Sequence, residues 1–149
     1  MGSIPNLRTI FMDTRLHKRL RVGWNEKLTC KSGIYLQRWV IEFPWLSVRV
    51  HHWLLSDDDR AKHDHPWWFL TFVLRGGYDD HHDNGLDVVK APCIRFRAAE
   101  HRHIVKVHPG GCWTFIVTGP KIRRWGFWVK GKFLRSFKYF YRFGEHHCD

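Results

Sequence analysis

Two histidines separated by one residue, His63 and His65, are the side chains of this sequence best suited to chemistry. They stand in the run HDHPW at residues 63–67, which leads into an apolar segment that ends at Gly76 and Gly77. On a β-strand, residues i and i+2 point to the same face, so both imidazoles can approach one point. Imidazole is the commonest metal ligand at neutral pH. The spacing therefore predicts a divalent metal site that suits iron, zinc, nickel or manganese.

A third ligand is expected on a later strand. His103 is favoured because it opens the alternation His103, Val105, Val107, and His101 has the same parity and stays an alternative. His51, on the strand before the histidine pair, is a further candidate, either as a ligand or as a group that orients one.

Four other polar residues are candidates for work on a substrate. Asp80 follows the double glycine, where a bulge would turn its carboxylate inward as a substitute metal ligand. Asp80 and Tyr78, two residues before it, are also the catalytic candidates. Arg49 shares parity with His51, and Arg97 lies on a short alternating segment. An inward-facing guanidinium binds a carboxylate or phosphate through two parallel hydrogen bonds, so both arginines are expected to hold an anionic substrate.

The elements that must position these residues are strands. Bulky aromatic rings make up 16% of the 149 residues, and such rings favour strands and bury much area each. Short apolar alternations separated by turn residues predict strands at 34–41, 46–55, 66–75, 86–90, 93–97, 102–107, 113–118 and 122–129, with a hairpin turn at 83–85. We expect one domain over residues 1–149. Its parts are a helical lead-in at 1–26, an antiparallel β-barrel or sandwich at 27–130, and an aromatic, basic tail at 131–149.

The net charge indicates what kinds of partner to expect, and the cysteines indicate the cellular compartment. A net charge of +11 indicates a small anionic substrate, or a nucleic-acid partner, for which charge alone is a weak signal. The four cysteines form no CxxC pair, which favours reduced thiols in a cytoplasmic protein. No signal peptide is evident, and no apolar run reaches the roughly 20 residues that span a bilayer, so no membrane partner is expected.

The order of these motifs resembles the cupin superfamily. His63 and His65 match the HxH pair of the first cupin motif, Gly76 or Gly77 its closing glycine, and Pro92 the proline of the second motif. The stretches at 35–39, 56–60, 63–67, 113–119 and 125–127 are similar to a group of phage and bacterial cupin-like proteins with an HDHPW motif. The resemblance implies an all-β, cupin-type barrel or jelly roll, led here by a short N-terminal helix, and a homodimer paired through its sheets.

One departure from the cupin pattern bears on function. Where the cupin ligand glutamate should fall, this sequence has Phe69 and Leu70, which cannot bind a metal. The resemblance then implies a neutral three-histidine centre, as in cupin thiol dioxygenases, and hence an Fe(II)-type oxygenase acting on a small polar or anionic molecule. The alternatives are a non-catalytic ligand-binding or sensor barrel, or a metal-independent sugar-nucleotide epimerase or isomerase. The last would use His65, Asp80 and Tyr78.

Overall fold

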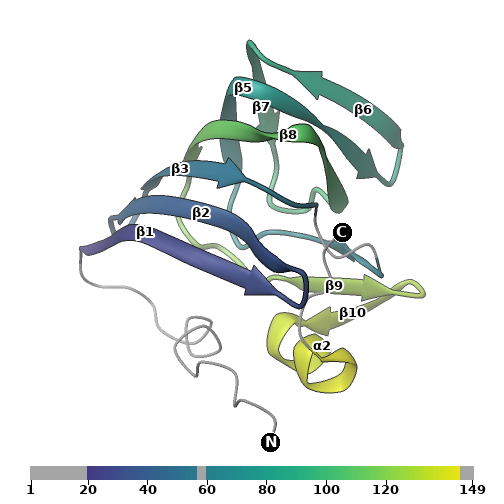
Figure 1. Cartoon of the computed structure of the whole chain (residues 1–149). Coiled ribbons are helices and arrows are strands. Elements are labelled where there is room, and N and C mark those ends of the chain that lie inside the picture. Colours follow the sequence, from purple (N-terminus) through teal and green to yellow (C-terminus); the bar gives the residue numbers. More distant parts are fainter. Residues whose placement is uncertain (1–19, 57–59, 145–149) are drawn as a thin grey trace, which may run out of the picture.

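The computed structural model describes residues 20–56 and 60–144, which form ten strands and one helix (Figure 1). The elements in chain order are β1 (Arg21–Cys30), β2 (Gly33–Glu42), β3 (Ser47–Trp53), β4 (Lys62–His63), β5 (Phe69–His82), β6 (Gly85–Lys90), β7 (Cys93–Arg97), β8 (His103–Thr118), β9 (Gly126–Val129), β10 (Lys132–Arg135) and α2 (Ser136–Phe143).

The strands pair antiparallel in the order β1-β2-β3-β8-β4-β9-β10, and β5 joins β6, β7 and β8. The two long strands, β5 and β8, are paired from Phe69 opposite Thr118 to His82 opposite His103. They hold the molecule together, because β8 also pairs with β3 and β4 (Figure 1). The architecture is all-β and antiparallel, as predicted.

Strand β8 is continuous where the sequence predicted two strands, at 102–107 and 113–118. Gly110 and Gly111 lie inside it with φ of 93° and 81°, a conformation that other residues rarely adopt. The chain therefore changes direction at the glycines without leaving the sheet. The extra residues of this irregularity lie in β8, between Val107 and Cys112, opposite Gly76 and Tyr78 of β5. A Cβ atom at Gly76 would collide with the carbonyl oxygen of Gly111.

The helix lies at the other end of the chain from the one predicted. β1 begins at Arg21, so residues 21–26 of the expected helical lead-in are strand, and residues 1–19 lie outside the described residues. The described helix, α2, follows β10 in the segment predicted to be an aromatic tail. It forms there because Tyr139 stacks on Phe127 of β9, with ring centroids 3.8 Å apart. Packing of this kind stabilises short helices that are marginal on their own.

Two kinds of interior follow from the strand alternation. Apolar side chains of β5, β6 and β8 form one core cluster, made of Val73, Tyr78, Val89, Val105 and Cys112. Along β3, in contrast, Ser47, Arg49 and His51 are the buried residues. The barrel thus has an unusually polar inner wall on the β3 side, and buried polar groups of this kind need partners.

The structure also bears on the expectations of reduced thiols and of no membrane-spanning segment. Cys93 and Cys112 carry free thiols, but Cys30 is disulfide-bonded, so the expectation of reduced thiols is wrong for Cys30. Within residues 20–56 and 60–144, no helix has both the length and the apolar character needed to cross a membrane.

Candidate metal centre

Three imidazoles from three segments meet at one end of the barrel. His63 ends β4, His65 follows it in the connection to β5, and His103 begins β8. Their ring centroids are 4.8 to 5.0 Å apart, and one ligand nitrogen from each lies within 4.8 Å of the others. The Nε2 atoms of His65 and His103 are 2.9 Å apart. These residues therefore form a group that could hold a metal ion.

The histidine pair is held in place by the residue between its members. Asp64 is fully buried, and its carboxylate accepts hydrogen bonds from the Gly126 backbone N–H (2.9 Å) and the Trp128 indole N–H (3.0 Å). The guanidinium of Arg123 pairs with the same carboxylate at 2.9 Å. Since Asp64 points away from the histidines into the β9 side, it fixes the connection and leaves both imidazoles free to turn toward His103.

His103 is oriented by Asp80. The Nδ1–H of His103 donates to the Asp80 carboxylate at 2.8 Å, which leaves the Nε2 atom unprotonated and facing His65. A metal-binding histidine in proteins is commonly fixed in this way, with the distal N–H on a carboxylate. The tautomer that a ligand at this position needs is therefore set by the fold.

Asp80 is itself the centre of a buried cluster. Arg97 donates to it from Nε and Nη2 at 3.1 and 3.0 Å, and His101 donates from Nε2 at 3.1 Å. Burial alone would raise the pKa of Asp80, but the hydrogen bonds from His101 and His103 hold that pKa well below its ordinary value. The carboxylate is thus ionised and fully engaged, and Arg97 is balanced by Asp80 and Asp87, the latter at 2.6 Å.

His65 is neutral in this environment. Burial lowers the pKa of His65 well below its ordinary value, and the adjacent imidazoles of His103 and His63 lower it further. A metal ion requires an unprotonated ring nitrogen, so the depressed pKa of His65 favours binding near neutral pH. Ring edges also enclose the group, because His65 packs on Phe69 with centroids 4.5 Å apart.

The other sequence candidates lie outside the three-histidine group. His101 joins Asp80 and His103 in a second group of possible ligands, so the geometry brings His103, and not His101, to His63 and His65. His51 is buried on β3, and neither of its ring nitrogens has a hydrogen-bond partner in the described part of the chain. Tyr78 belongs to the apolar core cluster, where burial raises its pKa.

Arg49 lies in the polar inner wall. It donates to Ser47 at 2.9 Å and to Glu42 at 2.8 Å, and its guanidinium stacks over the Trp67 ring at 4.5 Å from the centroid. Burial lowers the pKa of Arg49 to about 10, against the opposing effect of Glu42, so the group stays protonated at neutral pH. Trp67 follows His65 by two residues and thereby links Arg49 to the histidine segment.

Two residues that matter here were missed by sequence reasoning. Asp64 had a signal, since it alternates with the two histidines and must face the opposite way on an extended segment. Asp87 had none, because its contact with Arg97 depends on how β6 and β7 both pair with β5.

No protein-family model matches the sequence, and no curated protein matches it. Solved structures do resemble it. The polyketide cyclase RemF from Streptomyces resistomycificus has 16% sequence identity and a TM-score of 0.55, with 88% of this chain and 93% of that chain covered. The Fe(II) protein HppE has 16% identity and a TM-score of 0.53, and the DMSP lyase DddQ from Ruegeria pomeroyi DSS-3 has 11% identity and a TM-score of 0.52.

These matches establish the fold alone. The alignments cover 70% of this chain for HppE and 71% for DddQ, but only 58% of either neighbour's chain. This chain therefore spans less than two thirds of the length of those two proteins. The shared architecture is the cupin barrel.

Proposed function

We propose that this cupin-type barrel binds one divalent metal ion through His63, His65 and His103 and uses it as an Fe(II)-type oxygenase on a small polar or anionic molecule. The observation that carries the proposal is the convergence of three imidazole nitrogens within 4.8 Å. Support comes from a neighbour of the same fold that is an Fe(II) protein, HppE.

The nitrogen spacing fits a coordination sphere. A metal–imidazole bond is about 2.1 Å, so two ligands at a right angle are separated by about 3 Å. The Nε2 atoms of His65 and His103 are 2.9 Å apart, where the Nε2–H of His65 donates to His103. Binding of a cation requires that this proton leaves Nε2 of His65. The fold thus holds these two nitrogen atoms at the spacing that a metal would impose.

The charge of the site favours anions. Asp80 is occupied by Arg97, His101 and His103, so the first set of ligands has no carboxylate and leaves the metal its 2+ charge. When bound, such a metal supplies a Lewis acid and positions open to substrate and oxygen. Arg49, protonated, paired with Glu42 and stacked on Trp67 two residues from His65, is the residue that would hold an anionic group of the substrate.

The chain's own residues then have distinct tasks. His63, His65 and His103 bind the ion, Asp80 keeps the Nε2 lone pair of His103 directed at it, and Asp64 fixes the loop. Phe69 stands against His65 and limits water on that side. The geometry does not favour an epimerase, because Asp80 is fully engaged and Tyr78 lies among apolar side chains with a raised pKa.

Element analysis of untagged protein tests the metal. We expect about one iron or other divalent ion per chain, and none after His63→Ala and His65→Ala are combined. His51→Ala is the matched control, because His51 is also buried but lies outside the group, and it should keep the metal. Stoichiometric metal in the double variant would overturn the assignment.

Calorimetry with oxalate on the iron-loaded protein tests the anion. We expect binding in the micromolar to millimolar range, weakened in Arg49→Lys, which keeps the charge and loses the planar guanidinium. If the metal-bound protein has no affinity for oxalate, the metal assignment stands but the proposal of an anionic substrate is refuted.

A further inference from the structure

The positive charge of the chain is concentrated in its last third. Residues 101–144 contain ten lysines and arginines and no aspartate or glutamate. The metal centre uses none of those after Arg123, which pairs with Asp64. The surface formed by β10 and α2 carries Lys132, Arg135, Lys138 and Arg142, all exposed. A basic surface of this density attracts anionic partners, including ones larger than a small substrate.

Helix α2 presents aromatic rings that packing does not explain. Its inner face, with Tyr139 and Phe140, covers Phe127 of the barrel. On its outer face Tyr141 is 94% exposed and Phe137 is 45% exposed. The two residues are four apart, so they lie one above the other on successive turns, about 6 Å apart along the axis. Neighbouring exposed aromatic rings of this kind are more typical of an interaction surface than of a surface that contacts only solvent.

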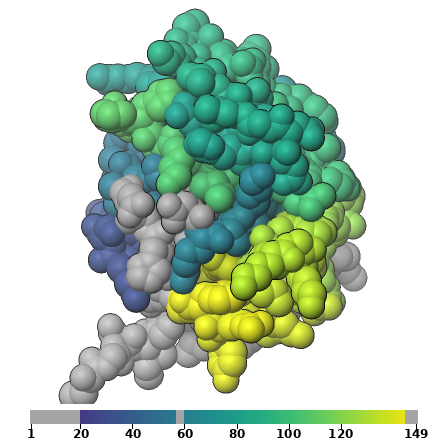
Figure 2. All heavy atoms as spheres, turned by 90° about the vertical axis from the view of Figure 1, so that its right-hand side faces the viewer, coloured from purple at the N-terminus to yellow at the C-terminus, as the bar shows by residue number. Residues whose placement is uncertain are grey.

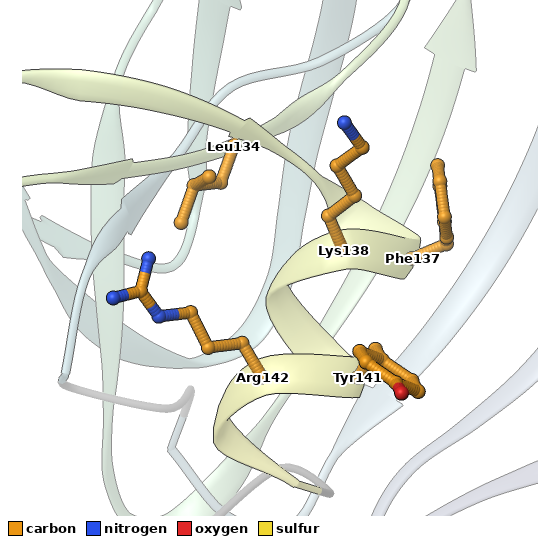
Figure 3. A pocket seen from close by; sticks show the side chains of 5 residues that line it. All are labelled: Leu134, Phe137, Lys138, Tyr141 and Arg142. Carbon is orange, nitrogen blue, oxygen red and sulfur yellow. The ribbon is translucent and has the colours of Figure 1, made fainter.

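A row of cations runs beside the rings. Lys138 and Arg142 follow Phe137 and Tyr141 by one residue each, and Figure 3 shows the four side chains on successive turns of α2. Together with Leu134 of β10 they line an open hollow of about 470 Å³ with an almost wholly apolar wall. Among the described residues, no carboxylate lies within 4.0 Å of Lys138 or Arg142. In Figure 2 the yellow residues of α2 lie at the surface, beside the yellow-green residues of the β9–β10 segment.

We propose that this face, defined by Leu134, Phe137, Lys138, Tyr141 and Arg142, binds single-stranded nucleic acid. Bases stack on Phe137 and Tyr141, and the phosphates pair with Lys138 and Arg142. Single strands are bound in this way, by aromatic platforms inside a basic groove, because every unpaired base has a free ring face. A duplex offers phosphates but keeps its base faces covered, so it would use only half of the surface.

A lipid surface fits less well. Membrane-surface helices insert a broad apolar face into the headgroup region, but the apolar face of α2 is already packed on the barrel. The rings of Phe137, Tyr141 and Phe143 stay exposed on α2, and Leu134 of β10 is half-buried, which is no broad apolar face.

Fluorescence anisotropy with labelled 12-mers of dT and rU, and with a DNA duplex of equal length, tests the proposal. We expect single strands to bind more tightly than the duplex, and Tyr141→Ala to weaken them roughly 10-fold. Lys138→Gln with Arg142→Gln should reduce the slope of log affinity against log salt by about 1.4. The controls are Trp45→Ala, also well exposed at 65%, and Lys27→Gln with Lys31→Gln, two exposed lysines four residues apart.

Three results would overturn it. They are equal affinity for duplex and single strand with no effect of Tyr141→Ala, equal losses in the control variants, or binding only to vesicles of phosphatidylcholine with phosphatidylserine. Since none of the mutated residues lies near the metal centre's ligands in sequence or in the described contacts, metal content should be unchanged in every variant.

Discussion

Asp80 and His51 are both buried polar residues of the barrel, with 1% and 7% of their surface exposed, but their surroundings differ. Asp80 accepts hydrogen bonds from Arg97, His101 and His103. Neither ring nitrogen of His51 has a hydrogen-bond partner among the described residues, and the same holds for the hydroxyl of Thr114, its neighbour on β8. We call the region around Asp80 complete, because its polar side chains have hydrogen-bond partners. We call the region around His51 and Thr114 incomplete, because theirs do not among the described residues.

The difference indicates two roles for buried polar residues: one region orients side chains, and the other can bind a small molecule. A buried network with every member satisfied fixes its side chains, which is what a ligand such as His103 needs. A buried group without a partner costs about 1 to 3 kcal/mol, and such groups in native proteins usually meet a water molecule or a ligand. The Asp80 region therefore serves to position the metal centre. The region around His51 lies next to Arg49 on the same strand face. Its unpartnered polar atoms can form hydrogen bonds with a small polar molecule.

The largest expected effect is on the complete region. Asp80→Asn removes the charge that balances Arg97, so we expect the free energy of unfolding to fall by about 3 to 5 kcal/mol in urea titrations. Metal affinity should fall about 10- to 100-fold, because His103 loses its orienting partner. Asp79→Asn is the matched control. Within the described residues its carboxylate pairs with the part-exposed His108, and the substitution should cost less than about 1 kcal/mol. Equal losses in the two variants would refute the comparison.

A medium effect is expected from pH, through His51. Burial lowers the pKa of His51 well below its ordinary 6.5, so below that pH the unfolded chain takes up a proton that the folded chain refuses. Stability is therefore full above about pH 7 and is lost as the pH falls. Between pH 7.5 and 5.5, His51→Leu should reduce the loss of unfolding free energy by about 1.4 kcal/mol, measured in EDTA to remove metal. An unchanged loss would mean that His51 is protonated in the folded protein.

Asp80 adds to the acid sensitivity at lower pH. Its pKa is depressed in the folded state, so its contribution is present above the unfolded value of about 3.9 and declines as the pH falls below about 5. The two regions are thus expected to respond in separate windows, His51 first and Asp80 second.

The smallest effect is expected when the incomplete region is made apolar. At pH 7.5, His51→Leu and Thr114→Val each remove a buried polar group without a hydrogen-bond partner in residues 20–56 and 60–144, so unfolding free energies should change by less than about 1 kcal/mol or rise. Metal content should stay that of the unmodified protein. A loss near 3 kcal/mol would show that these groups do have a partner in solution, and chemical denaturation with and without oxalate would then tell whether it is an anion.

Much of the fold is predictable because its signals are local. Alternation of apolar residues locates β2, β3, β6 and β7, and the turn residues Asp83 and Asn84 with Gly85 locate the β5–β6 hairpin. The double glycine indicates the break in register between β5 and β8 at Gly76 and Tyr78. The same local reasoning fails at Gly110 and Gly111, where turn residues lie within one strand because Gly76 allows the two backbones to approach.

The candidate site is predictable only in part. The spacing of His63 and His65 indicates two ligands, although His65 lies beyond the end of β4 and not on a strand. The choice of His103 over His101 depends on the pairing of His63 with His103 across β4 and β8. The cluster of Asp80 with Arg97 depends on three strands in register. Such long-range pairings leave no trace in the residues near each member.

The anchoring of Asp64 has a consequence for the heat and entropy of metal uptake. Because its carboxylate ties the loop between the histidines to Gly126, Trp128 and Arg123 without any ion, the loop has little conformational freedom left to lose. Uptake should then bury almost no new apolar surface and give a heat-capacity change near zero. Asp64→Ala should convert it into a binding step coupled to ordering, with a distinctly negative heat-capacity change and a larger entropic penalty.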